Sequence, residues 1–188
     1  MTNKKHIDLE IIDNCIPEFY QDYFEAICLG KTKGCEIETG LAWTAKYEGT
    51  ARRDGVSPLS FKHVLKSSAE LSEHLVNFST IPVSVVNKLG FGLNELIFAR
   101  LFLTIPYNTD LKYHDPHVDL NFPHTSLIYY VNDSDGDTVF FQPDYKTIYT
   151  SVTPKKGRCV VFNGLIPHSA GIPTAGPRCI ANFNLQIS

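Results

Sequence analysis

The sequence predicts a mostly β protein with flanking α-helices, and two observations support this prediction. From about Glu95 onward, short apolar segments alternate with turn residues, a texture typical of antiparallel strands. The first half instead contains longer stretches whose apolar residues have helical spacing. At 188 residues the chain is long enough for one domain with a substantial core. We therefore expect residues 1–95 to form a helical support, with a possible lid, and residues 96–188 to form the β core.

The second half is expected to contain eight strands. They are placed at residues 97–105, 112–118, 125–132, 137–142, 146–152, 157–162, 167–172 and 178–187. Eight short antiparallel strands suit a double-stranded β-helix, or jelly roll, the architecture also used by cupins. The polar run at residues 132–137 is a clear loop signal between two of these strands.

The start of the chain predicts one strand and one helix. Residues 7–12 alternate in polarity, and a helix is expected over Glu18–Leu29, with Pro17 in its first turn. Gly30 and Gly34 are the expected helix terminators.

The rest of the first half is less regular. Residues 61–79 have helix-compatible apolar spacing, Pro82 interrupts the pattern, and a second helix is expected over residues 83–89. These helices should pack as a wall outside a sheet. Residues 36–60 are interpreted as a long loop with strand fragments. They form either a substrate-covering lid or a surface connection anchored by Trp43, the only Trp.

Composition excludes several functional classes. Seventeen basic and twenty acidic residues give a net charge of −3 without long runs of one sign, which does not support nonspecific binding to nucleic acid or anionic membranes. No apolar segment is long enough to span a membrane and the start lacks a signal-peptide core, so a cytoplasmic protein is expected. The five cysteines contain no Cys-x-x-Cys pair, which favours reduced structural thiols over a zinc site.

A cluster of metal-ligand residue types lies in the predicted strand region. His117 and Asp119 are two residues apart, so in an extended segment they share one face at a Cα separation of roughly 6.5–7 Å. His168, from a later strand, would complete a 2-His-1-carboxylate triad of the kind typical of non-haem Fe(II) oxygenases. His114 competes with His117, but Pro116 stands where its acidic partner would be. Asp115 is an alternative carboxylate.

Arg178 follows His168 by ten residues, on the last apolar strand. An outward-facing Arg178 would be an ordinary sheet residue. An inward-facing Arg178 would need an anionic partner to offset its desolvation, and a co-substrate carboxylate would provide a bidentate, charge-assisted one.

Taken together, these residues resemble one enzyme family. The order His-x-Asp, His, Arg resembles the Fe(II)/2-oxoglutarate-dependent dioxygenases, particularly the prolyl 4-hydroxylase-like branch. Three further segments, Leu127–Asn132, Asp135–Phe140 and Pro154–Phe162, resemble strand and turn motifs of this family. The resemblance covers about residues 97–187.

The resemblance implies a site and a reaction. Fe(II) would be held by His117, Asp119 and His168, because the family's carboxylate follows its His by two. 2-Oxoglutarate would be held by Arg178 with Tyr129 and Tyr107. With O2 as oxidant, the enzyme would hydroxylate a peptidyl, prolyl-like or small-molecule substrate and release succinate and CO2. Asp119 favours hydroxylation over halogenation, since halogenases of the family replace this residue with a small one.

Two alternatives stay open. A cupin-like metalloenzyme could use the same triad without 2-oxoglutarate, and Arg178 is the residue that separates the two. A catalytically inactive jelly roll that binds a ligand or partner is the other. His114 is expected at the site entrance and His124 on the substrate side or the surface, and Asn182 or Asn184 is expected to support a ligand. The sequence specifies neither the substrate nor the oligomeric state.

Overall fold

The computed structural model describes residues 7–30, 41–46 and 60–188. Its helices are α1 (Glu18–Leu29), α2 (Leu75–Phe78) and α3 (Thr80–Lys88). Its strands are β1 (Leu9–Ile12), β2 (Thr44–Lys46), β3 (Ser60–Lys66), β4 (Leu93–Thr104), β5 (Thr125–Tyr130), β6 (Thr138–Phe141), β7 (Ile148–Val152), β8 (Cys159–Asn163), β9 (His168–Ala170) and β10 (Arg178–Ile187).

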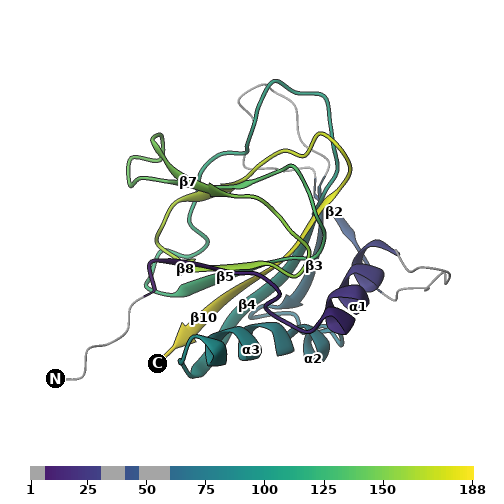
Figure 1. Cartoon of the computed structure of the whole chain (residues 1–188), viewed down its shortest axis with the longest axis vertical. Coiled ribbons are helices and arrows are strands. Elements are labelled where there is room, and N and C mark those ends of the chain that lie inside the picture. Colours follow the sequence, from purple (N-terminus) through teal and green to yellow (C-terminus); the bar gives the residue numbers. More distant parts are fainter. Residues whose placement is uncertain (1–6, 31–40, 47–59) are drawn as a thin grey trace.

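These strands form two antiparallel sheets. The larger has the order β1-β8-β5-β10-β4-β3-β2 and the smaller the order β7-β6-β9. Figure 1 shows the smaller sheet lying over one face of the larger sheet, while the three helices lie against its other face. The predicted fold class, a jelly roll supported by N-terminal helices, is confirmed.

Strand alternation divides the core into two clusters. Leu127 and Tyr129 of β5 point toward the helices, where they pack in a cluster with Phe24 of α1. Ile128 and Tyr130 point the other way, into the space between the sheets. Because neighbouring residues of a strand face opposite sides, each of these four β5 residues belongs to one cluster only. The space between the sheets is where the candidate site lies.

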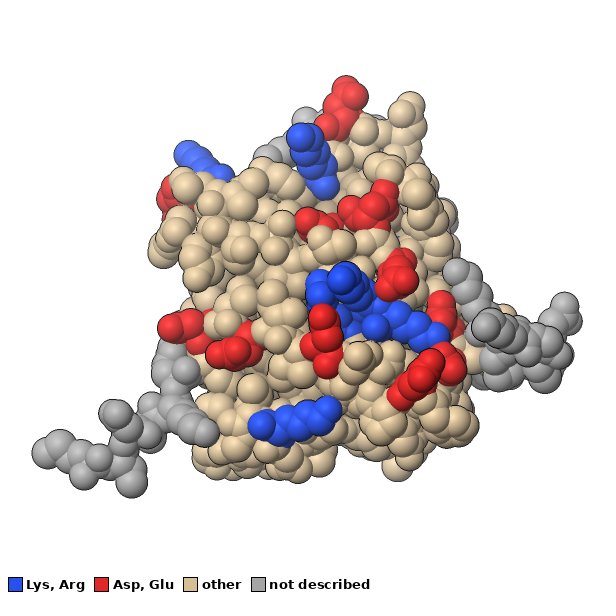
Figure 2. Space-filling model, viewed as in Figure 1, with Lys and Arg blue, Asp and Glu red and all other residues tan. Residues whose placement is uncertain are grey.

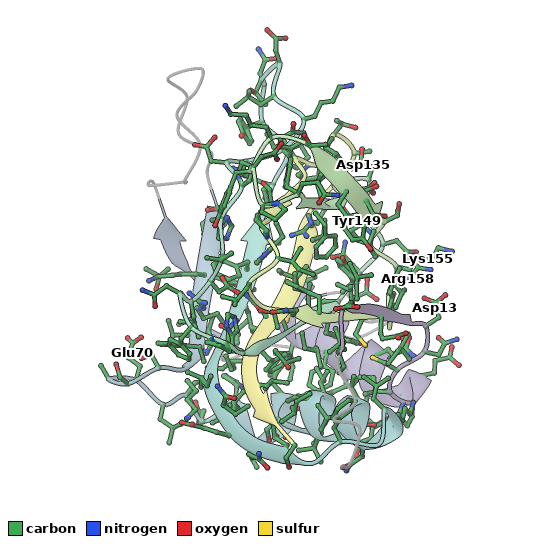
Figure 3. All side chains as sticks on the ribbon, turned by 90° about the vertical axis from the view of Figure 1, so that its left-hand side faces the viewer. Asp13, Glu70, Asp135, Tyr149, Lys155 and Arg158 are labelled. Carbon is green, nitrogen blue, oxygen red and sulfur yellow. The ribbon has the colours of Figure 1, made fainter. Side chains whose placement is uncertain are left out.

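The first strand and helix match the prediction. α1 spans Glu18–Leu29, with Pro17 at its N-cap position. It ends at Gly30, whose φ of 66° lets its N–H reach the carbonyl of Ala26. Gly34, the second expected terminator, lies outside the described residues. Figure 3 shows Asp13, which follows β1, beside Arg158, and the carboxylate accepts hydrogen bonds from Arg158 Nε at 2.5 Å and Nη2 at 2.9 Å.

The helix predicted over residues 61–79 is wrong in its first part. Residues 60–66 form β3, which pairs with β4, and only Leu75–Phe78 is helical. A short apolar pattern fits both periods, and here the unpaired edge of β4 decides in favour of the strand. Pro82 does not interrupt a helix either: it lies in the first turn of α3, where its missing N–H has no helical partner to lose.

The strand predicted over residues 112–118 is also wrong. This segment contributes only isolated bridges, Tyr113 with Gly171 and His117 with His168. Pro116 in its middle lacks the N–H that a continuous ladder requires. The other seven predicted strands are present: β10 has the predicted bounds and the other six differ at one or both ends. Trp43 packs against the helix-side core. Most of the predicted loop or lid over residues 36–60, namely residues 36–40 and 47–59, lies outside the described part.

Candidate metal centre and cavity

His117, Asp119 and His168 converge on one point, and their ligand atoms all lie within 4.8 Å of one another. His117 Nε2 lies 4.0 Å from Asp119 Oδ1, and His168 Nε2 lies 4.0 Å from Asp119 Oδ2. The bridge between residues 117 and 168 places the two imidazole rings 5.0 Å apart. Within the described residues, no other cluster of three such side chains has this geometry.

Both imidazoles are oriented by the backbone. Nδ1 of His117 lies 3.1 Å from the carbonyl oxygen of Asp115, and Nδ1 of His168 lies 3.1 Å from that of Ile166. A carbonyl oxygen only accepts, so each Nδ1 carries the proton and each Nε2 presents its lone pair to the centre. This is the arrangement in which histidines bind metal ions in proteins.

The carboxylate of Asp119 is held by amide groups. Nδ2 of Asn182 and Nδ2 of Asn184 both donate to Asp119 Oδ2 at 2.9 Å. Burial by itself would raise the pKa of Asp119, but the charges of His168 and Arg100 and these two amides lower it to about 2. The carboxylate is therefore ionised at neutral pH, as a metal ligand must be. The expectation that one of the two asparagines supports a ligand is met by both.

His168 is the most enclosed of the three ligands. Burial lowers its pKa to about 4, against the opposing effect of the Asp119 charge, so the ring is neutral at physiological pH. Phe162 packs edge-on against the ring at 4.9 Å and Phe140 lies 6.3 Å from it. The apolar walls exclude water from this side of the centre.

Arg178 lies in the same cavity and is only 2% exposed. Its Nε donates to the Gly136 carbonyl at 2.7 Å and its Nη2 to Thr138 Oγ1 at 2.8 Å, while the Tyr130 ring lies 6.0 Å from its guanidinium carbon. Among the described residues, no carboxylate forms an ion pair with it. Burial lowers the pKa of Arg178, the sign expected of a charge that lacks a full counter-ion.

One cavity of about 300 Å³ joins the triad to Arg178. Its walls come from β3, β4, β5, β6, β9, β10 and the loop around His117. The volume lies at the lower end of the range typical of small-molecule sites.

Tyr129 does not lie where the family resemblance implied. Its ring faces the helices, 6.2 Å from that of Phe24, and its buried hydroxyl has no hydrogen-bond partner. The adjacent Tyr130 faces the cavity side and donates to Thr138 Oγ1 at 2.7 Å, the same oxygen that Arg178 contacts. The pairing register of β5 decides this, because a shift of one residue exchanges the two faces.

His114 lines the cavity, whereas Tyr107 does not. His114 is buried and lines the cavity, which places it deeper than the expected entrance. Tyr107 does not line this cavity but lies behind His114, with ring centroids 6.4 Å apart, on a neighbouring surface groove.

His124 is neither on the surface nor beside the triad. Its Nδ1 lies 2.8 Å from the Phe122 carbonyl, and its Nε2 accepts from Ser126 Oγ at 3.2 Å. Ser126 Oγ accepts in turn from Asn184 Nδ2 at 3.2 Å. His124 therefore belongs to a buried chain of hydrogen bonds that ends at Asp119.

Arg100 of β4 is a cavity residue for which sequence reasoning had no signal. Its Nη2 lies 3.5 Å from Asp119 Oδ1 and donates to Asn184 Oδ1 at 3.2 Å. No local motif surrounds it, since its neighbours form an apolar strand that resembles several others in this chain. Tyr130 and Thr138 were within recognised segments but were not singled out.

Comparison with known proteins shows the fold. No protein-family model and no curated protein matches the sequence. A prolyl-4-hydroxylase from Pseudomonas putida superposes with a TM-score of 0.62 at 14% identity, over 96% of this chain and 92% of that one. A 2OG-Fe(II) oxygenase family oxidoreductase from Burkholderia pseudomallei gives 0.69 at 10% identity, over 95% and 84%. HygX from Streptomyces hygroscopicus, with nickel, 2-oxoglutarate and hygromycin B bound, gives 0.61 at 11%, over 95% and 82%.

Proposed function

We propose that this protein is an Fe(II)- and 2-oxoglutarate-dependent dioxygenase that hydroxylates a peptidyl, prolyl-like or small-molecule substrate and releases succinate and CO2. One observation carries the proposal. A single cavity contains a His-Asp-His cluster and, away from it, a buried arginine without an acidic partner among the described residues. The fold shared with solved 2-oxoglutarate oxygenases supports this reading of the cavity.

The donor set fits a divalent transition metal. Two neutral imidazole nitrogens and one ionised carboxylate form the ligand set of non-haem Fe(II) oxygenases, which leaves coordination positions open for other ligands. His117, Asp119 and His168 would hold the ion. The Oδ1 atom of Asn182 is buried beside this centre without a hydrogen-bond partner, so it offers an acceptor to a bound ligand.

The rest of the cavity fits a dicarboxylate. Arg178 and Asn182, four residues apart on β10, are separated by roughly 13 Å of strand, so the arginine and the metal cluster can engage opposite ends of one small molecule. A charge-assisted contact between Arg178 and a carboxylate is worth roughly 1.5–3 kcal/mol. A carboxylate would offset the desolvation cost of the buried Arg178 charge, whereas a neutral ligand would not.

The protein's own residues would then orient the metal ligands, hold Arg178 for the co-substrate and exclude water from the centre. When bound, the iron and 2-oxoglutarate would activate O2, the oxidant that hydroxylation requires, with 2-oxoglutarate supplying two of the four electrons that O2 takes up. Asn182 and Asn184 hold Asp119 in one orientation, and the backbone carbonyls fix both histidines. Tyr130 and Thr138 hold Arg178, while Phe140 and Phe162 keep the His168 side dry.

Both substrate classes have support among the similar structures. A prolyl hydroxylase from Trichoplax adhaerens was solved with a peptide fragment, whereas HygX was solved with hygromycin B. Figure 2 shows acidic and basic side chains side by side on one face, without a continuous basic surface there. This mixture supports a peptide or small molecule over a nucleic acid.

The proposed location is the cytoplasm. All four described cysteines are buried and free, which fits a reducing compartment. No helix of the described chain has the length and apolar character needed to cross a membrane.

The first test is anaerobic titration of the metal-free protein with Fe(II) and then 2-oxoglutarate, monitored by the visible metal-to-ligand charge-transfer band. The wild type should develop the band only after both additions, His117→Ala should abolish it, and Arg178→Ala should weaken 2-oxoglutarate binding at least tenfold. Arg158→Ala, which removes an arginine from the exposed pair with Asp13, is the matched control and should titrate like the wild type.

The other outcomes identify the alternatives. Iron binding without a 2-oxoglutarate band would favour a cupin-like metalloenzyme that does not use this co-substrate. Absence of metal binding would favour an inactive jelly roll that binds a ligand or partner.

A further inference from the structure

Arg100 gives the cavity a second arginine, and this one is accessible. It lies on the cavity face of β4, opposite Asn182 of β10, and its side chain is 27% exposed. Arg178, by contrast, lies opposite Thr104 and is almost completely buried. The four-residue offset separates the two arginines along the sheet by roughly 13 Å. Arg100 is thus positioned beside Asp119 at the metal-cluster end, four residues along the sheet from Arg178.

The contacts of Arg100 leave its guanidinium incompletely paired. Its Nη2 lies 3.5 Å from Asp119 Oδ1, and its Nε is buried without a hydrogen-bond partner. Phe98 and Phe102 flank the group at 5.4 and 5.7 Å from their ring centroids. The aromatic rings hold the guanidinium in place but provide no counter-ion, so its Nε–H still needs an acceptor.

The charges of the cavity do not cancel when it is loaded. Among the described residues that line it, two arginines and one aspartate are the only side chains with a permanent charge, which leaves one positive charge in excess. A divalent metal ion and doubly negative 2-oxoglutarate neutralise each other, so they do not change this excess. Asp119 would give its charge to the metal, and Arg178 would be paired with the co-substrate. The excess charge is then located at Arg100.

We infer that Arg100 binds an anionic group of the substrate, and that the substrate is an organic acid with one carboxylate near the carbon that is oxidised. This inference rests on the proposed function, because the charge balance assumes bound metal and 2-oxoglutarate. It narrows the substrate class: a neutral amide or alcohol of the same shape would leave the guanidinium with no counter-ion except Asp119, which the metal also engages. Negative charge at this position complements the cavity, and positive charge opposes it.

The test uses a small fluorinated anion as the probe. Trifluoroacetate is titrated into full-length protein loaded with Mn(II) and saturating 2-oxoglutarate, and fluorine NMR line broadening by the paramagnetic ion reports its binding near the metal. Neutral trifluoroacetamide is the isosteric comparison. In the wild type, trifluoroacetate should show saturable broadening and trifluoroacetamide should not. Arg100→Gln should weaken trifluoroacetate binding roughly tenfold or more.

Controls separate this inference from the function on which it rests. Metal and 2-oxoglutarate binding are measured first for each variant, by Mn(II) magnetic resonance and by the Fe(II) charge-transfer band. Arg158→Gln changes the net charge equally but outside the cavity, and it should leave anion binding unchanged. Arg100→Lys retains the charge and should recover part of the affinity.

Three outcomes would overturn the inference. One is equal binding of the charged and neutral probes to the wild type. Another is full anion affinity in Arg100→Gln, which would mean that the anion binds the metal itself. The third is an Arg100→Gln variant that loses 2-oxoglutarate rather than trifluoroacetate, which would make Arg100 a co-substrate residue. If the wild type forms no metal and 2-oxoglutarate complex at all, the proposed function fails first and the charge argument fails with it.

Discussion

At the scale of single residues, the metal-facing carboxylate is held by an unusual pair of amides. Asn182 and Asn184 are two residues apart on β10, so they share a face, and both donate to one oxygen of Asp119. Asp119 Oδ1 therefore accepts fewer hydrogen bonds than Oδ2. Asn184 also donates to Ser126 Oγ, which in turn donates to His124 Nε2. Hydrogen bonds of this kind orient a metal ligand without touching the ion.

Asn184→Leu should lower metal affinity by about 10–100-fold, the usual effect of removing a partner of a metal ligand. The substitution keeps the side-chain volume but removes the donor to Asp119. Calorimetric titration with Ni(II) measures the effect. Asn77→Leu, which removes an amide that donates to Tyr23 on the helix side, is the matched control and should bind Ni(II) like the wild type. Equal affinity in both variants would contradict the proposed role.

Two adjacent tyrosines make a matched pair for the co-substrate end. Tyr130→Phe removes the hydroxyl that donates to Thr138 beside Arg178, and it should weaken 2-oxoglutarate binding several-fold. Tyr129→Phe should leave that affinity unchanged. Because the Tyr129 hydroxyl is buried and unpaired, and burial raises its pKa, its removal should be neutral or stabilise the protein by up to about 1 kcal/mol.

Titration of 2-oxoglutarate and urea unfolding of the two variants check this prediction. A larger loss of 2-oxoglutarate affinity in Tyr129→Phe than in Tyr130→Phe would show that the co-substrate does not lie beside Arg178 as proposed.

At the scale of elements, the turn between β5 and β6 positions Arg178. The carbonyl of Gly136 accepts from Arg178 Nε, and a Cβ at residue 136 would lie 2.7 Å from the Gly171 carbonyl oxygen and 3.1 Å from Arg178 Cδ. Figure 3 shows Asp135 in this region, where its carboxylate accepts from the backbone N–H of Thr174 at 3.0 Å. The turn is therefore packed against the loop that leads into β10.

Gly136→Ala should destabilise the protein by about 1–3 kcal/mol, since the added methyl group has no space, and should also weaken 2-oxoglutarate binding by displacing Arg178. Gly30→Ala is the control for stability alone. It strains the end of α1 at a positive φ, which should cost about 1 kcal/mol without changing co-substrate affinity. A Gly136→Ala variant with unchanged 2-oxoglutarate affinity would show that the turn does not position Arg178.

At the scale of the whole molecule, the candidate metal ligands come from a loop and from the smaller sheet, which are less firmly held than the centre of the larger sheet. β10 and β4 lie in the centre of the larger sheet, whereas residues 112–120 form a loop attached to β9 by isolated bridges. His117 and Asp119 belong to this loop, and His168 belongs to β9. A bound ion would therefore cross-link a loop to the smaller sheet.

Metal removal should loosen this loop selectively. Amide hydrogen exchange over residues 112–120 should slow at least tenfold on adding Ni(II) and recover with a chelator, while amides of β4 and β10 that exchange through local opening stay nearly constant. Saturating metal, at about 100 times its dissociation constant, should stabilise the folded state by about 2.7 kcal/mol. Uniform protection of all strands would contradict a local cross-link.

The limits of prediction appear at particular residues. The spacing of His117, Asp119 and His168 and the motifs around them were enough to predict three residues that the structure brings together, because i and i+2 positions share a face in any extended segment. The same reasoning failed for Tyr129, since the side of the sheet to which its side chain points depends on the register of β5 with β8 and β10. It failed for residues 61–66 because a short apolar pattern fits both a strand and a helix.

By itself, the sequence determined the jelly-roll class, the α1 helix and the residue types of the metal cluster, since these depend on local spacing and composition. Only the tertiary structure decided that Tyr130 rather than Tyr129 lies beside Arg178, that both asparagines of β10 hold Asp119, and that Arg100 reaches the same cavity. These are contacts between residues far apart in the chain. They follow from the pairing of β10 with β4 and β5, which no local pattern encodes.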